Sequence, residues 1–390
     1  MVQPDSDDLD SDAAEIDRLV TQHVENTHRT GLTTAEEIGV AGQLAAFGLS
    51  VNQIARRTRT KKAHVEKAVA AAESELAAKA TQRYDLTLEQ AATLAEFDDD
   101  PDTVKTLVAA AKDGQFDHVA QRARDDRAQI AAYDETVQRV SEQGITVVAE
   151  PEWDDPKVRD IRHLLHDDDK LTPEGHAGCP GGAAYVRGGR DWDCDEWTAE
   201  VVEVCTDYTA HGHTAPADEW RTTTSTSKRK PVGEMTDDER EQAREQRRFV
   251  IAHNKAWTSA TEVRRLWLAE WLTRKTPPKG TAVFVAGMIA AHPDLLPDID
   301  GNHLAAEWLG QPAGYGRSQD LADLIGNSDD RRAQVLTLAL VLAACEAHVA
   351  KDTWRRDGTT DWHGPYLRFV GEHGYGLAEV EEYAASDHTV

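Results

Sequence analysis

The sequence has few of the features that mark membrane, secreted or disulfide-rich proteins. No apolar run approaches the roughly 20 residues that a spanning helix needs. The first residues, MVQPDSDDLDSDAAE, are acidic where a secretory signal is basic and then apolar. Four cysteines in 390 residues are too few for a disulfide scaffold, so we expect thiols or metal ligands. We therefore expect a cytoplasmic protein with no membrane partner.

Positive charge is also scarce. Lys and Arg number 43 against 70 Asp and Glu, which gives a net charge of −27. Such a chain cannot bind nucleic acid non-specifically over its whole surface, so any such binding must be local. The length exceeds that of one ordinary domain, which predicts several folded units joined by linkers.

Periodicity and composition predict a mainly α fold. It consists of a helix-turn-helix multi-helix bundle, a small Cys/His-rich β unit and a C-terminal helical domain. The predicted segments are an acidic disordered N-terminus (1–19), a helix-turn-helix DNA-binding domain (20–130), a helix and linker (131–170), the β unit (171–221), a linker (222–235), the C-terminal helical domain (236–350) and a weakly patterned tail (351–390).

A basic island lies in residues 41–70, where six basic side chains accompany a single acid, Glu66. The pattern predicts a helix that ends at Gly48, a helix capped by Ser50, and a second helix from about Thr60. A recognition helix needs cations for phosphates and short polar groups for base edges. The candidate phosphate contacts are Arg56, Arg57, Arg59, Lys62 and Lys67, the candidates for base readout are Asn52, Gln53, Lys61 and His64, and the caps Ser50 and Thr60 complete the predicted DNA-binding set.

The alternative is an Ala-rich helical pair whose charges only solvate a surface. Two features favour DNA binding: the local charge is opposite in sign to that of the chain, and the two predicted caps introduce consecutive short helices. One feature weighs against it, because Arg59 occupies the turn, where a left-handed backbone suits glycine better.

Two motifs in this region resemble the ParB/KorB family of plasmid and chromosome partition proteins. SVNQIARRTRTKKAHVEKAV (50–69) is similar to the helix-turn-helix of that family, and ENTHRTGLTTAEE (25–37) is similar to its E-N-x-x-R segment. The segments 84–104 and 118–126 resemble later helices of the same domain, so the resemblance covers about residues 20–128. It implies a specific, palindromic duplex site bound by a homodimer, a partition ATPase as a further partner, and a nucleoid- or plasmid-associated location.

The resemblance also implies that Glu25, Asn26 and Arg29 bind CTP and Mg²⁺. The arginine-rich G-E-R-R loop that completes this site in the family is absent from the sequence, as is most of its nucleotide domain. A triphosphate needs backbone donors and cations, and the upstream segment offers acids. We therefore expect no nucleotide site, and an ion pair between Glu25 and Arg29 at a helix entry explains these residues without a ligand. Two explanations for the missing nucleotide domain are left open. Either the start site is assigned too far downstream, or the lineage has only the DNA-binding half.

A cluster of cysteines and histidines lies in the predicted β unit. His176 and Cys179 have H-x-x-C spacing, and Cys205 ends a strand-like run that histidines follow. A small Gly-rich β unit without a large apolar core would be stabilised by a tetrahedral structural Zn²⁺. The predicted ligands are His176, Cys179, Cys205 and His211, with His213 or Cys194 as substitutes. Reduced thiols and surface histidines are the alternative.

These patterns lead us to expect a sequence-specific double-stranded DNA-binding protein in plasmid or chromosome partition, or in plasmid gene regulation. We find no catalytic constellation and expect no enzyme. The rival hypotheses are a truncated CTP-dependent partition clamp that hydrolyses nucleotide, and a protein-interaction scaffold.

Overall fold

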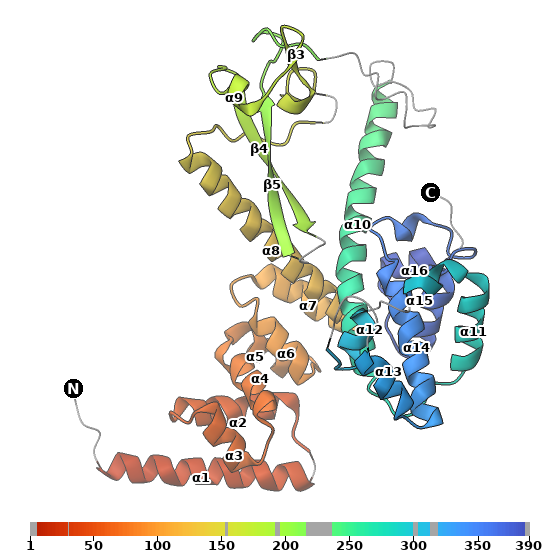
Figure 1. The fold of residues 1–390 in the computed structure, drawn as a ribbon. Coiled ribbons are helices and arrows are strands. Elements are labelled where there is room, and N and C mark those ends of the chain that lie inside the picture. The colour runs from red at the N-terminus through yellow and green to blue at the C-terminus, as the bar shows by residue number, and fades with distance from the viewer. Residues whose placement is uncertain are drawn as a thin grey trace. The chain divides into compact units, whose positions relative to one another are not determined.

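The computed structural model describes residues 6–29, 31–152, 155–191, 196–215, 236–298, 303–312 and 319–386. Over these residues the chain is mainly helical with a small antiparallel sheet, which confirms the predicted fold class (Figure 1). The chain forms two compact units. One contains Met1–Gln121 and Trp257–Val390, and the other contains Arg122–Ala256.

Short helices with local caps build the N-terminal part of the first unit. Thr33, Ser50 and Thr87 each form a capping box with the residue three positions later, and Asp100 caps a helix whose first residue is Pro101. These caps satisfy backbone donors that the first turn leaves free. The helices are α1 (Ser6–Arg29), α2 (Thr34–Ala46), α3 (Val51–Thr58), α4 (Lys62–Glu73), α5 (Glu75–Arg83), α6 (Leu88–Ala95) and α7 (Pro101–Lys112). The next helix, α8 (Phe116–Glu142), begins in this unit and continues into the second one, which starts at Arg122.

The N-terminus differs from the expected disordered segment 1–19, because α1 begins at Ser6. Ile16 and Leu19 lie three residues apart on one helix face and are buried against Leu44, Ile54 and Val65. Two apolar side chains at helical spacing are enough to hold the middle of an otherwise acidic helix on the bundle. The acidic composition concealed this short apolar stripe.

The second unit contains a sheet with strand order β1–β5–β4, all antiparallel. β4 (Gly182–Asp191) and β5 (Glu196–Cys205) form a long hairpin, and β1 (Arg159–Asp160) pairs with the end of β5. Trp197 donates a hydrogen bond to Asp125 of α8, at 3.4 Å. The remaining elements are η1 (Ile161–His163), β2 (Leu165–His166), β3 (Asp169–Lys170) and α9 (Pro173–His176).

Apolar burial in this β unit is modest. Ala183, Tyr185, Val202 and Val204 form one small cluster. A second cluster joins Ile161, Leu164, Leu171 and Cys205. Two clusters with four buried side chains each give limited hydrophobic stabilisation, so a further constraint on the loops would add to the stability of the unit.

The C-terminal helices pack around α14 (Asp330–Ala347), most of whose side chains are buried. The expected weakly patterned tail, 351–390, also packs here, with Tyr366, Leu367 and Val370 buried. Its helices are too short to show a periodic pattern. The other elements are α10 (Asp237–Trp271), which spans the boundary of the two units, α11 (Thr281–Ala291), η4 (Pro293–Asp298), α12 (His303–Trp308), α13 (Gln319–Gly326), η5 (Thr353–Arg355), α15 (His363–Glu372) and α16 (Glu379–Ala385).

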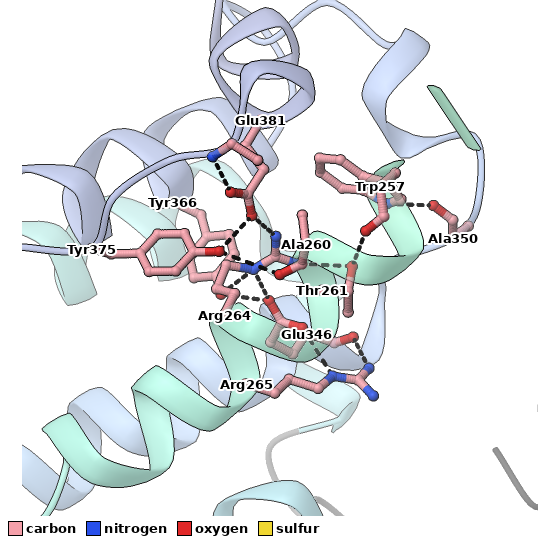
Figure 2. A network of polar contacts seen from close by, with 11 residues as sticks. Trp257, Ala260, Thr261, Arg264, Arg265, Glu346, Ala350, Tyr366, Tyr375 and Glu381 are labelled. Atoms are coloured by element: carbon pink, nitrogen blue, oxygen red, sulfur yellow. Dashed lines mark hydrogen bonds and ion pairs between the residues drawn. The ribbon is translucent and has the colours of Figure 1, made fainter. Parts of the chain in front are cut away.

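A buried polar network ties these helices together, as Figure 2 shows. Arg264 of α10 is fully enclosed and pairs with Glu346 of α14 and Glu381 of α16. Tyr366 donates a hydrogen bond to Glu346, and Tyr375 donates one to Glu381 at 3.1 Å. One cation therefore joins three helices that lie 82 and 117 residues apart in sequence.

Charge compensation makes this burial tolerable. Burial alone would raise the pKa of Glu346, but the guanidinium groups of Arg264 and Arg265 lower it below its usual value. Arg265 approaches the second carboxylate oxygen of Glu346 at 3.1 Å. Removal of the central cation would leave a carboxylate in a dry interior, which is strongly unfavourable.

We predict that Arg264→Met lowers the free energy of unfolding of the unit that contains it by about 3–5 kcal/mol, because Glu381 and in part Glu346 lose their counter-charge. Urea unfolding followed by circular dichroism measures this. A matched control is Arg356→Met, whose pair with Asp361 is about half exposed and is expected to contribute less than about 1 kcal/mol. Equal losses in the two variants would contradict this account of the network.

Candidate helix-turn-helix surface and metal centre

The predicted helix-turn-helix pairs α3 with α4. The Ser50 hydroxyl accepts a hydrogen bond from the Gln53 amide, and the Gln53 side chain accepts one from the Ser50 amide at 2.8 Å. At the other end of α3, Arg59 has φ 56° and ψ 33°, the left-handed conformation expected at this turn. A non-glycine residue in this region carries some strain, and here the strain reverses the chain between the two helices.

The predicted cap of α4 is wrong by one residue. Lys61, with no side-chain cap, occupies that position, and Thr60 belongs to the end of α3. The amides of Arg59 and Thr60 both donate to the carbonyl of Ala55, which closes α3 through its last turn. The left-handed residue places the Thr60 amide in this closing turn of α3. The N-cap position of α4 therefore falls on the next residue.

An apolar cluster fixes the angle between the helices. Leu44 of α2, Ile54 of α3 and Val65 of α4 are almost wholly buried and contact one another, with Ile16 and Leu19 of α1 completing the cluster. Leu49, Ala55 and Val69 are partly buried against it. The charged residues of α3 and α4 must therefore lie on the opposite faces.

Three cations around the turn are exposed and form no ion pair within the described part of the chain: Arg56, Arg59 and Lys61. Asn52, on the first turn of α3, is exposed as well. These side chains are open to a partner from solvent.

Four other predicted contacts already have acidic partners. Arg57 pairs with Asp17 of α1 at 3.3 Å, Lys62 with Glu66 at 3.3 Å, and Lys67 with Glu89 of α6 at 3.1 Å. A ring nitrogen of His64, Nε2, lies 3.1 Å from Glu37 of α2. Sequence reasoning missed the pairs of Arg57, His64 and Lys67, because the acids on α1, α2 and α6 lie 22 to 40 residues away from their partners.

The residues that the resemblance assigns to a nucleotide lie on the last turns of α1. Glu25 is exposed, Asn26 is partly buried, and the side chain of Arg29 is outside the described residues. The expected position of Glu25 and Arg29 at a helix entry is wrong, because α1 begins at Ser6 and ends at Arg29.

The cysteine and histidine cluster converges at one end of the β unit. His176 ends α9, Cys179 lies in the following loop, Cys205 ends β5, and His213 follows in a turn. One ligand atom from each of these four residues lies within 4.8 Å of every other, so the group could hold a metal ion. His213 replaces the predicted His211, and Cys194, the other named substitute, lies outside the described residues.

The distances fit a tetrahedral ion. Ligand bonds of about 2.3 Å to sulfur and about 2.0–2.1 Å to nitrogen place two sulfurs about 3.8 Å apart, and a sulfur and a nitrogen about 3.6 Å apart. Cys179 Sγ lies 3.9 Å from Cys205 Sγ and 3.4 Å from His213 Nε2. These two distances therefore match the spacing of ligands around a tetrahedral ion.

The protonation of the two histidines also suits a cation. Burial lowers the pKa of His176 and His213, so both rings favour the neutral form that binds metals. Burial and the neighbouring Cys179 thiol raise the pKa of Cys205 to about 12, which only a nearby cation would reverse. His176 Nε2 is buried without a hydrogen-bond partner in the described structure, which leaves a nitrogen for such an ion.

Gly181 packs directly against the cluster, and the sequence motifs did not predict its role there. A Cβ at this position would lie 2.5 Å from His211 Cδ2, 2.6 Å from the carbonyl oxygen of Thr206 and 2.8 Å from Cys205 Sγ. Only glycine lets the loop approach the end of β5 this closely. The consecutive glycines in the CPGG run were the available signal.

No family model, curated protein or solved structure matches this chain. Among the described helices, none combines the length and apolar composition that crossing a membrane requires. A functional hypothesis must therefore be built from the two sites themselves.

Proposed function

We propose that this protein binds double-stranded DNA sequence-specifically through α3 and α4, in plasmid or chromosome partition or in plasmid gene regulation. The observation that carries the proposal is the left-handed turn at Arg59 between two short helices, surrounded by exposed unpaired cations in a strongly acidic chain. A surface that merely needed solvation would have no reason to concentrate cations at this turn.

In this proposal α4 is the recognition helix. Lys61, Lys62 and Ala63 are exposed on its first turn, and His64 is partly exposed beside them, where a recognition helix meets base edges in the major groove. Arg56 and Arg59 flank that turn and contact phosphates. The exposed pairs of Lys62 and Lys67 are worth at most about 1 kcal/mol each, so these cations exchange a carboxylate for a phosphate at little cost.

One recognition helix reads half a site, so two copies of the chain bind a palindrome. The resemblance to the ParB/KorB family supports this arrangement, a location at the nucleoid or on a plasmid, and a partition ATPase as a partner. We assign no catalytic step to the chain.

We further propose that the four-residue metal centre holds a structural Zn²⁺. Two thiolates and two neutral imidazoles are a ligand set typical of zinc. Four protein ligands complete the tetrahedron, which leaves no open position for a substrate or a reactive water. The ion supplies the constraint that the two small apolar clusters of the β unit lack.

We predict that Arg56→Ala weakens binding to all duplex sequences and lowers the slope of log K against log salt by about 1, because one phosphate contact is lost. His64→Ala should instead reduce discrimination between preferred and random sequences. Fluorescence anisotropy with labelled duplexes at several salt concentrations measures both effects.

Two control variants isolate these effects. Lys105→Ala removes an exposed cation of α7 and should leave binding unchanged. Glu37→Gln removes the partner of His64 while the ring is retained, so it should preserve discrimination. If Arg56→Ala and Lys105→Ala have the same effect, the proposed interface is wrong.

We predict about one zinc ion per chain, and chelation should abolish the fixed tertiary structure of the β unit. Gly181→Ala should lower zinc affinity at least about tenfold, a loss of about 1.4 kcal/mol, because its Cβ displaces Cys205. Gly178→Ala is the matched control, since a Cβ there meets no atom within 4 Å. Metal analysis measures the zinc content, and near-UV circular dichroism measures the tertiary structure before and after chelation. A spectrum insensitive to chelation would refute a structural role.

A further inference from the structure

The two thiols of the metal centre lie close enough to join. Cys179 Sγ and Cys205 Sγ are 3.9 Å apart. A disulfide bond is about 2.05 Å long, so the two sulfurs must come about 1.9 Å closer together. Cys205 is fixed at the end of β5, whereas Cys179 lies in the short loop between α9 and β4 and is free of sheet pairing. The loop can supply the movement.

Access to the pair is asymmetric. Cys205 is fully buried, whereas Cys179 is partly exposed. A small oxidant therefore reaches Cys179 first. Cys205 is then the resolving thiol, which attacks the oxidised sulfur of Cys179. Cys345, in contrast, is fully buried within α14.

We propose that Cys179 and Cys205 form an oxidation site at which a peroxide converts the metal centre to an intrachain disulfide and releases the ion. This inference rests on the proposed zinc site. It assigns the centre a regulatory role in addition to its structural one.

The reaction balances with hydrogen peroxide as the oxidant. The Cys179 thiolate attacks one peroxide oxygen, the O–O bond breaks, and a sulfenic acid and hydroxide form. The Cys205 thiolate then attacks Cys179 Sγ, which forms the S–S bond and expels a second hydroxide. Two protons from solvent convert the hydroxides to water. The thiolates lose two electrons, the peroxide gains them, and Zn²⁺ leaves unchanged because a disulfide is a poor ligand.

Loss of the ion has a structural consequence. His176 and His213 remain more than nine-tenths buried without the metal to bind their ring nitrogens. The loop after α9 and the turn after β5 then lose the link between them, while the new disulfide still joins the loop to β5. We expect the β unit to loosen reversibly rather than unfold completely.

The test treats the zinc-loaded full chain with increasing hydrogen peroxide. Released zinc is measured with a colorimetric indicator, and free thiols are trapped with N-ethylmaleimide before mass spectrometry. We expect release of one zinc for each pair of thiols lost, a peptide crosslink between Cys179 and Cys205, and recovery of zinc binding after dithiothreitol. Cys345→Ser should behave like the wild type.

The outcomes separate this inference from the zinc proposal. A chain that binds no zinc during reconstitution refutes the zinc site, and with it the inference. A chain that holds zinc but resists peroxide, or that releases zinc with sulfinic acid on Cys179 and no crosslink, refutes the oxidation site alone.

Discussion

The contact of Ile54 with Val65 and Leu44 is the constraint on which the proposed interface depends. Burial of these side chains fixes one face of α3 and one face of α4, so the polar residues between them must point to solvent. The same cluster recruits Ile16 and Leu19, and thereby orders an acidic helix that composition alone would leave unfolded. Without this apolar cluster, the cations near Arg59 would not be held on one side of the helix pair.

In each described part of the molecule, several charged side chains are compensated by nearby groups of opposite charge. On the surface of the bundle, acids of α1 and α6 pair with Arg57 and Lys67, Glu37 of α2 contacts His64, and cations that form no ion pair within the described residues lie near the turn. In the C-terminal helices the signs are exchanged, because there an enclosed arginine compensates two buried carboxylates. In the metal centre an ion would play the same part for two thiolates. A chain of net charge −27 can therefore present a locally basic surface, provided that its cations there have no acidic neighbours.

Local interactions were predictable from the sequence, and long-range ones were not. The cap at Ser50 depends on Gln53, three residues away, and the left-handed turn followed from the spacing of two helices around Arg59. Three of the four clustered residues were predicted as ligands and His213 only as a substitute, because the choice of His213 over His211 depends on a turn with left-handed residues at Asp207 and Gly212. The pairing of Arg264 with Glu381 spans 117 residues, and no periodicity reports it. The helices of the tail were missed for the same reason, since their burial depends on distant partners.

Selection from a pool of random duplex DNA, sequenced after binding at two salt concentrations, tests the central claim most directly. The account predicts enrichment of a palindromic site that persists at the higher salt, with loss of unselected sequences. Retention of all sequences at low salt without enrichment would reduce the island to a basic patch. No retention at either concentration would contradict DNA binding, and would favour a protein-interaction scaffold.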